Sequence, residues 1–181
     1  GAVVNIDLKQ DELESLKVET LKGKAESIIN YYVVNDEFNK LEGDKRLTLK
    51  KSITKTKGEG SDIKLGDILQ IKLDYDFKTE APEGCYNLTD HIPSGLTCID
   101  NPSSYGLIIG NHGYMYDSGN NIVKGCAYHS DWWRRYSNNS SIYYVKVSAV
   151  GKYVNESAIM QSTIDPTIFQ KTSEEFINIS K

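Results

Sequence analysis

The stretch that decides the fold is Tyr86-Asn87-Leu88-Thr89-Asp90-His91-Ile92-Pro93-Ser94-Gly95-Leu96. It is a short apolar run that ends at a carboxylate and a Pro-x-Gly turn, which predicts a strand finishing at residues 90–92. We expect the chain to reverse through Pro93-Ser94-Gly95, because proline presets φ and glycine adopts a positive φ at little cost. Apolar sequence then resumes at residues 96–99. Nothing in this stretch points to catalysis.

Alternating apolar and polar residues recur on both sides of this stretch. In residues 68–77 the odd-numbered positions from Leu69 to Phe77 are apolar and the positions between them are polar, which predicts an amphipathic strand. Residues 47–53 and 143–149 alternate in the same way, so we expect two further strands with one solvent-exposed face each. The remaining strand candidates are residues 27–34, 122–129, 153–161 and 174–179.

Many short strands separated by turn clusters predict an all-β fold, specifically an antiparallel β-sandwich. At most one short helix is expected, within residues 8–18, where Leu13 and Leu16 are three apart. We expect one sandwich domain over residues 23–181. Residues 1–22 are interpreted as a connector or first strand from a preceding domain.

Composition argues against two classes of partner. The 181 residues carry a net charge of −4 and the isoelectric point is near 5.4, so no basic surface for nucleic acid is expected. The lysines are interleaved with acidic residues, as on an ordinary solvated surface. No apolar run approaches about 20 residues, so we expect no membrane insertion by this chain.

The sequence contains no phosphate-binding glycine loop, His-Glu-x-x-His pair, Gly-x-Ser-x-Gly elbow or Cys-x-x-Cys pair. We therefore assign no catalytic, cofactor-binding or metal-binding residue and expect a protein that is not an enzyme. Cys126 and His129, with Asp131 nearby, are the nearest approach to a nucleophile and base or to half of a zinc site. Residues three apart on a strand point to opposite faces, so ordinary strand residues are the alternative.

Cys85, Cys98 and Cys126 are odd in number. Cys85 and Cys98 lie on either side of the Pro-x-Gly reversal, where adjacent segments would allow a disulfide in an exported protein. The alternative is three small buried apolar side chains.

An aromatic stretch contains Trp132, Trp133, Arg134 and Tyr136. Adjacent tryptophans on a strand face opposite ways, so one of them needs a partner outside the core. A protein-contact surface is one interpretation. A tryptophan lying on its own sheet, or a carbohydrate-stacking position, are the others.

Three segments in this order resemble the C-terminal macroglobulin-like domain of bacterial α2-macroglobulins, in the version found in Gram-positive lineages. Residues 63–71 are similar to the family's Gly-Asp lead-in to an amphipathic strand. Residues 86–96 are similar to its Asp-x-Leu-Pro-Ala-Gly-Leu signature. Residues 142–153 with 158–161 resemble its paired-tyrosine strand, glycine turn and following strand. The resemblance covers about 120 residues, 60–180, and implies a macroglobulin or immunoglobulin-like sandwich.

Membership of that family would imply an extracellular, cell-envelope protein that traps proteases through an internal thioester. The thioester needs a Cys-x-Glu-Gln type motif, and none of the three cysteines has one, so the bond would lie in a separate domain. This domain would pack on the thioester domain and on neighbouring macroglobulin domains of the same parent chain, and would meet proteases only through the parent protein. No cofactor is implied.

The resemblance also implies a loop that shields the thioester from water. By position it consists of Ser162, Thr163, Ile164, Asp165 and Pro166. Better-known relatives have Met-Tyr where Thr163-Ile164 stand, so a plain surface turn is the alternative. A different function is equally compatible with the Pro-x-Gly signature: an adhesin or stalk module of a Gram-positive surface protein.

Overall fold

The computed structural model describes residues 6–9, 12, 15–17, 19, 22–24, 38–130 and 139–181. The chain divides into two compact units, Gly1–Leu41 and Glu42–Lys181. In the first unit, Glu12 is helical, within the range where the short helix was expected, and the backbone N–H groups of Glu12 and Ser15 donate to Lys9 O and Glu12 O. The strand candidate at 27–34 lies outside the described residues, so it and the expected domain boundary after residue 22 stay predictions. No helix in the described parts of the chain is long and apolar enough to cross a membrane.

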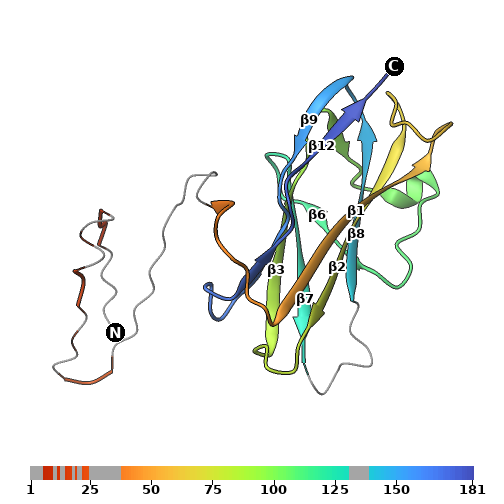
Figure 1. Cartoon of the computed structure of the whole chain (residues 1–181). Coiled ribbons are helices and arrows are strands. Elements are labelled where there is room, and N and C mark those ends of the chain that lie inside the picture. Colours follow the sequence, from red (N-terminus) through yellow and green to blue (C-terminus); the bar gives the residue numbers. More distant parts are fainter. Residues whose placement is uncertain are drawn as a thin grey trace. The chain divides into compact units, whose positions relative to one another are not determined.

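The second unit is built almost entirely of strands (Figure 1). They are β1 (Leu47–Lys57), β2 (Ile68–Phe77), β3 (Gly84–His91), β4 (Leu96–Cys98), β5 (Gly113–Tyr114), β6 (Tyr116–Asp117), β7 (Ile122–His129), β8 (Ser140–Val147), β9 (Gly151–Asn155), β10 (Ile159–Ser162), β11 (Phe169–Lys171) and β12 (Glu175–Ile179), with a 3-10 helix η1 (Pro102–Tyr105). One sheet has the order β1-β2-β8-β4, with β5 added beside β8, and the other has the order β11-β10-β3-β7-β6. Strands β9 and β12 form a separate pair.

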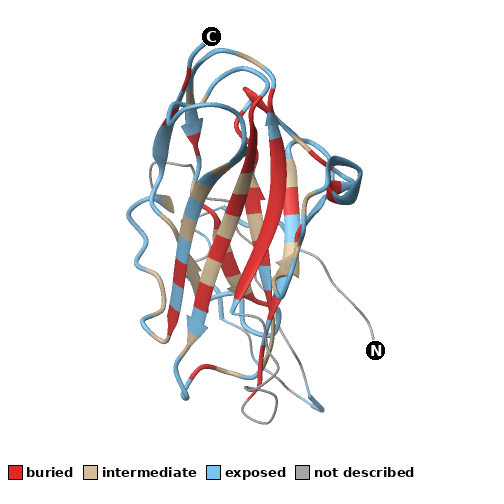
Figure 2. Ribbon diagram, turned by 90° about the vertical axis from the view of Figure 1, so that its right-hand side faces the viewer, coloured by how far each residue is buried: buried red, intermediate tan, exposed pale blue. Residues whose placement is uncertain are grey.

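The pairing is antiparallel throughout these sheets except between β5 and β8. The two larger sheets face each other, and Figure 2 shows buried positions alternating with more exposed ones along their strands. This arrangement confirms the predicted antiparallel β-sandwich. Residues 68–77 and 122–129 form strands with the predicted bounds, whereas residues 153–161 are divided between β9 and β10.

The main core lies between the two larger sheets. Alternation places every second side chain of each strand in this layer, as the period of a strand requires. The fully buried members come from both sheets and include Leu69, Ile71, Leu73, Tyr86, Leu88, Val123, Tyr143, Val145 and Met160.

A second, smaller core covers the outer face of β8, where the sequence predicted solvent. Lys146 and Ser148 are exposed as expected, but Tyr144 is only 2% exposed. Ile142 and Tyr144 pack with Ile68 and Ile99, and Leu107 and Ile109 lie against this cluster. The connection from β4 to β5, residues 99–112, therefore crosses the outer face of β8 and removes it from water.

The reversal after β3 differs from its prediction in one respect. The turn forms, with Leu96 N donating to Pro93 O at 2.8 Å, but Gly95 has no positive φ. Glycine is required here by packing, because a Cβ would lie 2.7 Å from Cδ2 and Cζ of the Tyr153 ring. The turn also moves the chain from one sheet to the other, so β3 and β4 do not pair.

Candidate functional site

The predicted shielding loop, residues 162–166, connects β10 to β11 and is held by side-chain hydrogen bonds at both ends. Buried Ser162 accepts at Oγ from the backbone N–H groups of Ile164 and Asp165, both at 3.2 Å. The Thr163 hydroxyl donates to Cys85 O at 2.9 Å, which ties the loop to β3. Gln161 Nε2 donates to Pro166 O at 2.8 Å. The loop therefore has a defined shape before it meets any partner.

The second half of the loop is closed by Asp165. Its Oδ1 accepts from the Thr167 hydroxyl at 2.6 Å and from the Thr167 backbone N–H at 3.0 Å. These two donors, with a smaller contribution from the positive charge of Arg46, hold the pKa of Asp165 below its usual value.

The tip of this loop presents one large apolar side chain, Ile164, which is 73% exposed. Gly84 lies beneath it, and a Cβ added at Gly84 would come within 3.3 Å of Ile164 Cδ1. Gly84 also has a φ of +133°, which side chains other than hydrogen rarely accept. Gly84 therefore leaves room for one side of the Ile164 side chain to pack against the backbone, while the opposite side of Ile164 faces solvent.

The other predicted partner surface, Trp132, Trp133, Arg134 and Tyr136, lies outside the described residues, as does Asp131. Its role stays a prediction.

The structure corrects both interpretations of the cysteines. Cys85 of β3 and Cys126 of β7 form a disulfide, with their Cα atoms 5.8 Å apart, and Cys98 is free. The two strands are direct neighbours in one sheet, whereas Cys98 lies on β4 in the other sheet. The expected Cys85–Cys98 bond fails because the Pro-x-Gly turn joins two sheets and does not form a hairpin.

The disulfide also removes Cys126 from any nucleophile or zinc pair with His129. His129 points the other way, into the core, where its ring stacks on Phe77 with centroids 4.7 Å apart. Its Nε2 has no hydrogen-bond partner among the described residues. The opposite orientation of residues three apart on a strand is as expected.

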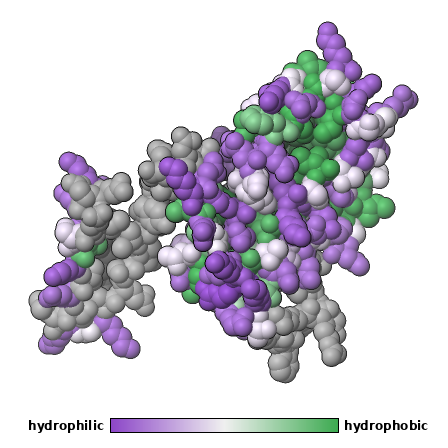
Figure 3. Space-filling model, in the orientation of Figure 1, coloured by the Kyte–Doolittle hydropathy of each residue, from purple (hydrophilic) through white to green (hydrophobic). Residues whose placement is uncertain are grey.

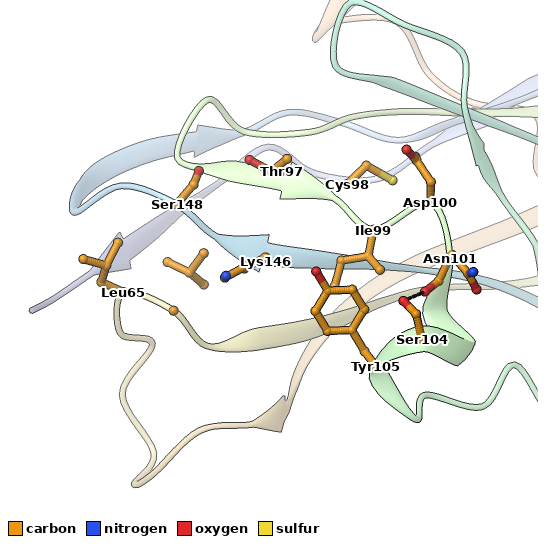
Figure 4. A pocket seen from close by; sticks show the side chains of 12 residues that line it. Leu65, Thr97, Cys98, Ile99, Asp100, Asn101, Ser104, Tyr105, Lys146 and Ser148 are labelled. Atoms are coloured by element: carbon orange, nitrogen blue, oxygen red, sulfur yellow. Dashed lines mark hydrogen bonds between the residues drawn. The ribbon is translucent and has the colours of Figure 1, made fainter.

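An open depression of about 630 Å³ lies beside β4 and β8 (Figure 4). Figure 4 shows Leu65 at one end, Tyr105 and Ser104 at the other, and Lys146 between them. Exposed apolar side chains of the second unit include Leu65, Tyr105, Ile108, Val150 and Phe176. On the face that Figure 3 draws, hydrophobic atoms of the second unit gather toward the end that carries the C terminus, while hydrophilic atoms cover most of the rest.

Among the described residues, Cys98, Asp100 and Asp117 place three potential metal ligands within 4.8 Å of one another. Burial, then the negative charges of Asp117 and Asp100, raise the pKa of the Cys98 thiol to about 11. The thiol is therefore protonated at neutral pH, whereas the thiolate is the form that binds metals.

A buried polar cluster that the sequence interpretation missed lies inside the sandwich. Lys51 of β1 is 2.7 Å from Asp90 Oδ1 of β3, and their side chains are 5% and 0% exposed. The Tyr143 hydroxyl of β8 donates to Asp90 Oδ2 at 2.7 Å. The sequence did contain a sign of this cluster. Lys51 stands between Leu49 and Ile53, so the alternation of the strand turns its side chain toward the core.

The fold is similar to that of known β-domains. Over 77% of this chain it matches the solved C-terminal region of native α2-macroglobulin from Escherichia coli, which begins at domain MG7, with a TM-score of 0.59 and 12% sequence identity. A streptococcal T6 backbone pilin from serotype M6 Streptococcus pyogenes matches over 74% of this chain with a TM-score of 0.44 and 17% identity, covering 36% of the pilin. No family model and no curated protein matches the sequence.

The similarity to the macroglobulin concerns the fold, since identity is low. This chain corresponds to 24% of the length of the solved macroglobulin fragment. The chain therefore has a fold similar to that of this macroglobulin C-terminal region.

Proposed function

We propose that this chain is a non-catalytic β-sandwich domain of a bacterial α2-macroglobulin-like protease-trapping protein, of the Gram-positive type. Its role is to pack against the thioester domain and neighbouring macroglobulin domains of the same parent chain. The 162–166 loop covers the thioester, and proteases meet this domain only through the parent. The observation that carries the proposal is the 73% exposed Ile164 on a loop fixed by hydrogen bonds, in a fold similar to that of a macroglobulin C-terminal region.

The chemistry of a thioester explains why such a loop is useful. A thioester is lost when water attacks it, so its lifetime depends on an environment from which water is excluded. A loop with a defined shape loses little conformational entropy on docking, and an isoleucine at its tip buries apolar surface when it does. Thr163 is occupied by its bond to Cys85 O, which leaves Ile164 as the side chain that can face the thioester.

The disulfide supports an extracellular, cell-envelope location. Disulfides persist in exported proteins and are rare in reducing compartments. The remaining thiol, Cys98, is half-buried and is followed by Ile99 and Asp100, so it lacks the residues of a thioester motif. The parent protein must therefore supply the thioester from another domain.

The first test is the parent gene. The proposal expects a much longer protein with a Cys-x-Glu-Gln type motif before this domain. Tandem copies of this domain with a wall-anchoring signal and no thioester motif would overturn it in favour of the adhesin or stalk module.

The second test measures the loop in the parent protein. Ile164→Asp should shorten the lifetime of the thioester, followed as the rate at which its cysteine becomes available to a thiol reagent. Ile108→Asp is the matched control, because Ile108 is 78% exposed and lies on the β4–β5 connection. Equal thioester lifetimes in the Ile164 variant and the wild type would exclude a shielding role for the loop.

A further inference from the structure

Three residues from three strands converge on one carboxylate inside the sandwich. Lys51 and Tyr143 belong to the sheet that contains β1 and β8, and Asp90 belongs to the opposite sheet. Lys51 Nζ is 2.7 Å from Oδ1, and the Tyr143 hydroxyl donates to Oδ2 at 2.7 Å. The His91 backbone N–H donates to Oδ1 at 2.9 Å. An amine and a carboxyl group are thus in contact across the core, with a donor on each carboxyl oxygen.

Burial of this pair disfavours the charged form of the Asp90 carboxyl group. The Asp90 side chain is fully buried and Lys51 is nearly so. Burial raises the pKa of Asp90, and the charge of Lys51 with the three hydrogen bonds offsets only part of that rise. Two charges removed from water are costly, and proton transfer from the ammonium to the carboxylate abolishes both.

The pair contains the amine and the carboxyl group that an amide bond joins, held 2.7 Å apart by the fold. Intramolecular placement replaces a bimolecular encounter and avoids its entropy cost. The Tyr143 hydroxyl is aimed at Oδ2, where negative charge would develop when an amine attacks Cγ.

We propose that Lys51 and Asp90 form an intramolecular amide cross-link between the two sheets. A proton passes from Lys51 Nζ to Asp90 Oδ1, and the neutral amine then attacks Cγ. The Tyr143 hydroxyl stabilises the oxyanion on Oδ2. Oδ1 takes a second proton from the nitrogen and leaves as water while the carbonyl forms again at Oδ2. One C–N bond forms, one C–O bond breaks, and no oxidant or reductant is needed.

A second lysine–aspartate pair of the same unit is a built-in comparison. Lys55 Nζ is 2.8 Å from Asp67 Oδ2, with side chains 13% and 7% exposed. Burial raises the pKa of Asp67, but the Lys55 and Lys64 donors and charges outweigh burial and lower it below its usual value. Lys55 also donates to the backbone carbonyls of Glu59 and Asp62, as Lys51 does to Glu156 O at 3.3 Å, so the two pairs differ mainly in the burial and pKa of the carboxyl group. The lowered pKa favours the charged form of Asp67, so this pair should remain an ordinary salt bridge.

The experiment is the intact mass of the full chain, reduced and denatured. The wild type should be lighter than its sequence mass by one water molecule. Lys51→Arg and Asp90→Ala should have their full sequence masses, whereas Lys55→Arg, the matched control, should keep the loss. Tyr143→Phe should slow the loss of water in freshly purified protein. A protease digest should yield one branched peptide that joins residue 51 to residue 90.

A wild-type chain with its full sequence mass would overturn the proposal, and because that chain needs no substitution, a misfolded variant does not affect this result. A loss of water that persists in Lys51→Arg would also overturn it, since that loss would come from cyclisation of another acidic residue. The cross-link is independent of the protease-trapping role, which a missing cross-link would leave intact.

Discussion

Asp67 joins the two ends of the connection between β1 and β2. Its Oδ2 accepts from the Lys64 backbone N–H at 2.8 Å and is 2.8 Å from Lys55 Nζ. Gly58 approaches so closely that a side chain there would collide with the carboxylate. The carboxylate therefore helps to hold this connection together, beside the bonds from Lys55 to the carbonyls of Glu59 and Asp62.

The lowered pKa of Asp67 predicts how stability responds to acid. A carboxyl group whose pKa is lower in the folded than in the unfolded chain stabilises the fold above its unfolded pKa, about 3.9. That contribution is lost as the pH falls through the folded pKa. The free energy of unfolding of the wild type should therefore fall more steeply below about pH 4 than that of Asp67→Asn, measured by urea unfolding at a series of pH values.

Comparison of the two proteins cancels the contributions of the other acidic residues. Asp76→Asn, which changes an exposed carboxylate of β2, should follow the wild-type curve. Parallel curves for the wild type and Asp67→Asn would contradict the predicted role of Asp67.

The turn after β3 needs glycine at position 95, because there is no room for a larger side chain beside Tyr153. Gly95→Ala should destabilise the protein by about 1–3 kcal/mol, because the added methyl group overlaps the Tyr153 ring. The cost is steric and does not involve backbone strain, so it should shrink in the Tyr153→Ala background. Urea unfolding of the four proteins of this cycle measures the coupling, and additive effects would contradict the contact.

At the scale of elements, a strand with strong alternation could be predicted from sequence, but the loop that covers a strand and the shortest strands could not. The alternation of residues 68–77 predicted that strand, because one of its faces is buried in the main core. Residues 122–129, a strand candidate without such alternation, also form a strand with the predicted bounds. The outer face of β8 was misjudged because its cover, residues 99–112, has no periodic pattern. Short strands such as β5 and β11 were missed for the same reason, since two or three residues carry no period.

The contacts that tie the 162–166 loop to β3 and those within the buried polar cluster could not be predicted either, because they join residues that are distant in the sequence. The 162–166 loop was proposed as a site from family resemblance, whereas its hydrogen bonds depend on Cys85 and Thr167, which lie outside the loop. Lys51 and Asp90 are 39 positions apart in sequence and meet only because β1 and β3 lie in facing sheets. Pairing of strands, on which the disulfide also depends, is a property of topology that local sequence does not specify.

The outer cluster on β8 depends on one tyrosine hydroxyl. Gln70 Nε2 donates to the Tyr144 hydroxyl at 2.9 Å, and that hydroxyl donates to Ile108 O at 2.6 Å. Tyr144→Phe should lower the free energy of unfolding by about 1–3 kcal/mol, because a buried donor and acceptor lose their partner. Tyr116→Phe, at a tyrosine that is 56% exposed, should change it by less than about 0.5 kcal/mol. Equal effects of the two substitutions in urea unfolding would contradict the bridging role of Tyr144.

At the scale of the whole molecule, the disulfide closes a covalent loop that includes a large part of the sandwich. Cys85 and Cys126 are 41 positions apart, and the closed loop contains β4, β5 and β6. Loop-closure entropy for that length predicts a loss of about 4 kcal/mol of stability in Cys85→Ser with Cys126→Ser. Cys98→Ser, the control, should keep the bond.

Alkylation counts the thiols directly. Iodoacetamide under denaturing, non-reducing conditions should add one group to the wild type, at Cys98, and three after reduction. Three groups without reduction would show that the bond is absent.

The division of the chain into two compact units predicts that the folded domain begins at Glu42. Among the residues that the structure describes, all members of both buried cores lie between Leu47 and Ile179, inside the unit Glu42–Lys181. A domain that contains its own core can fold alone, so a chain of residues 42–181 should unfold at the same urea concentration as the full chain. The sequence makes a competing prediction, because a strand at residues 27–34 would contribute its own contacts to the sandwich. A chain of residues 23–181 that is more stable than residues 42–181 would support that strand and place the boundary after residue 22. Equal midpoints for the three chains would place the boundary at Leu41.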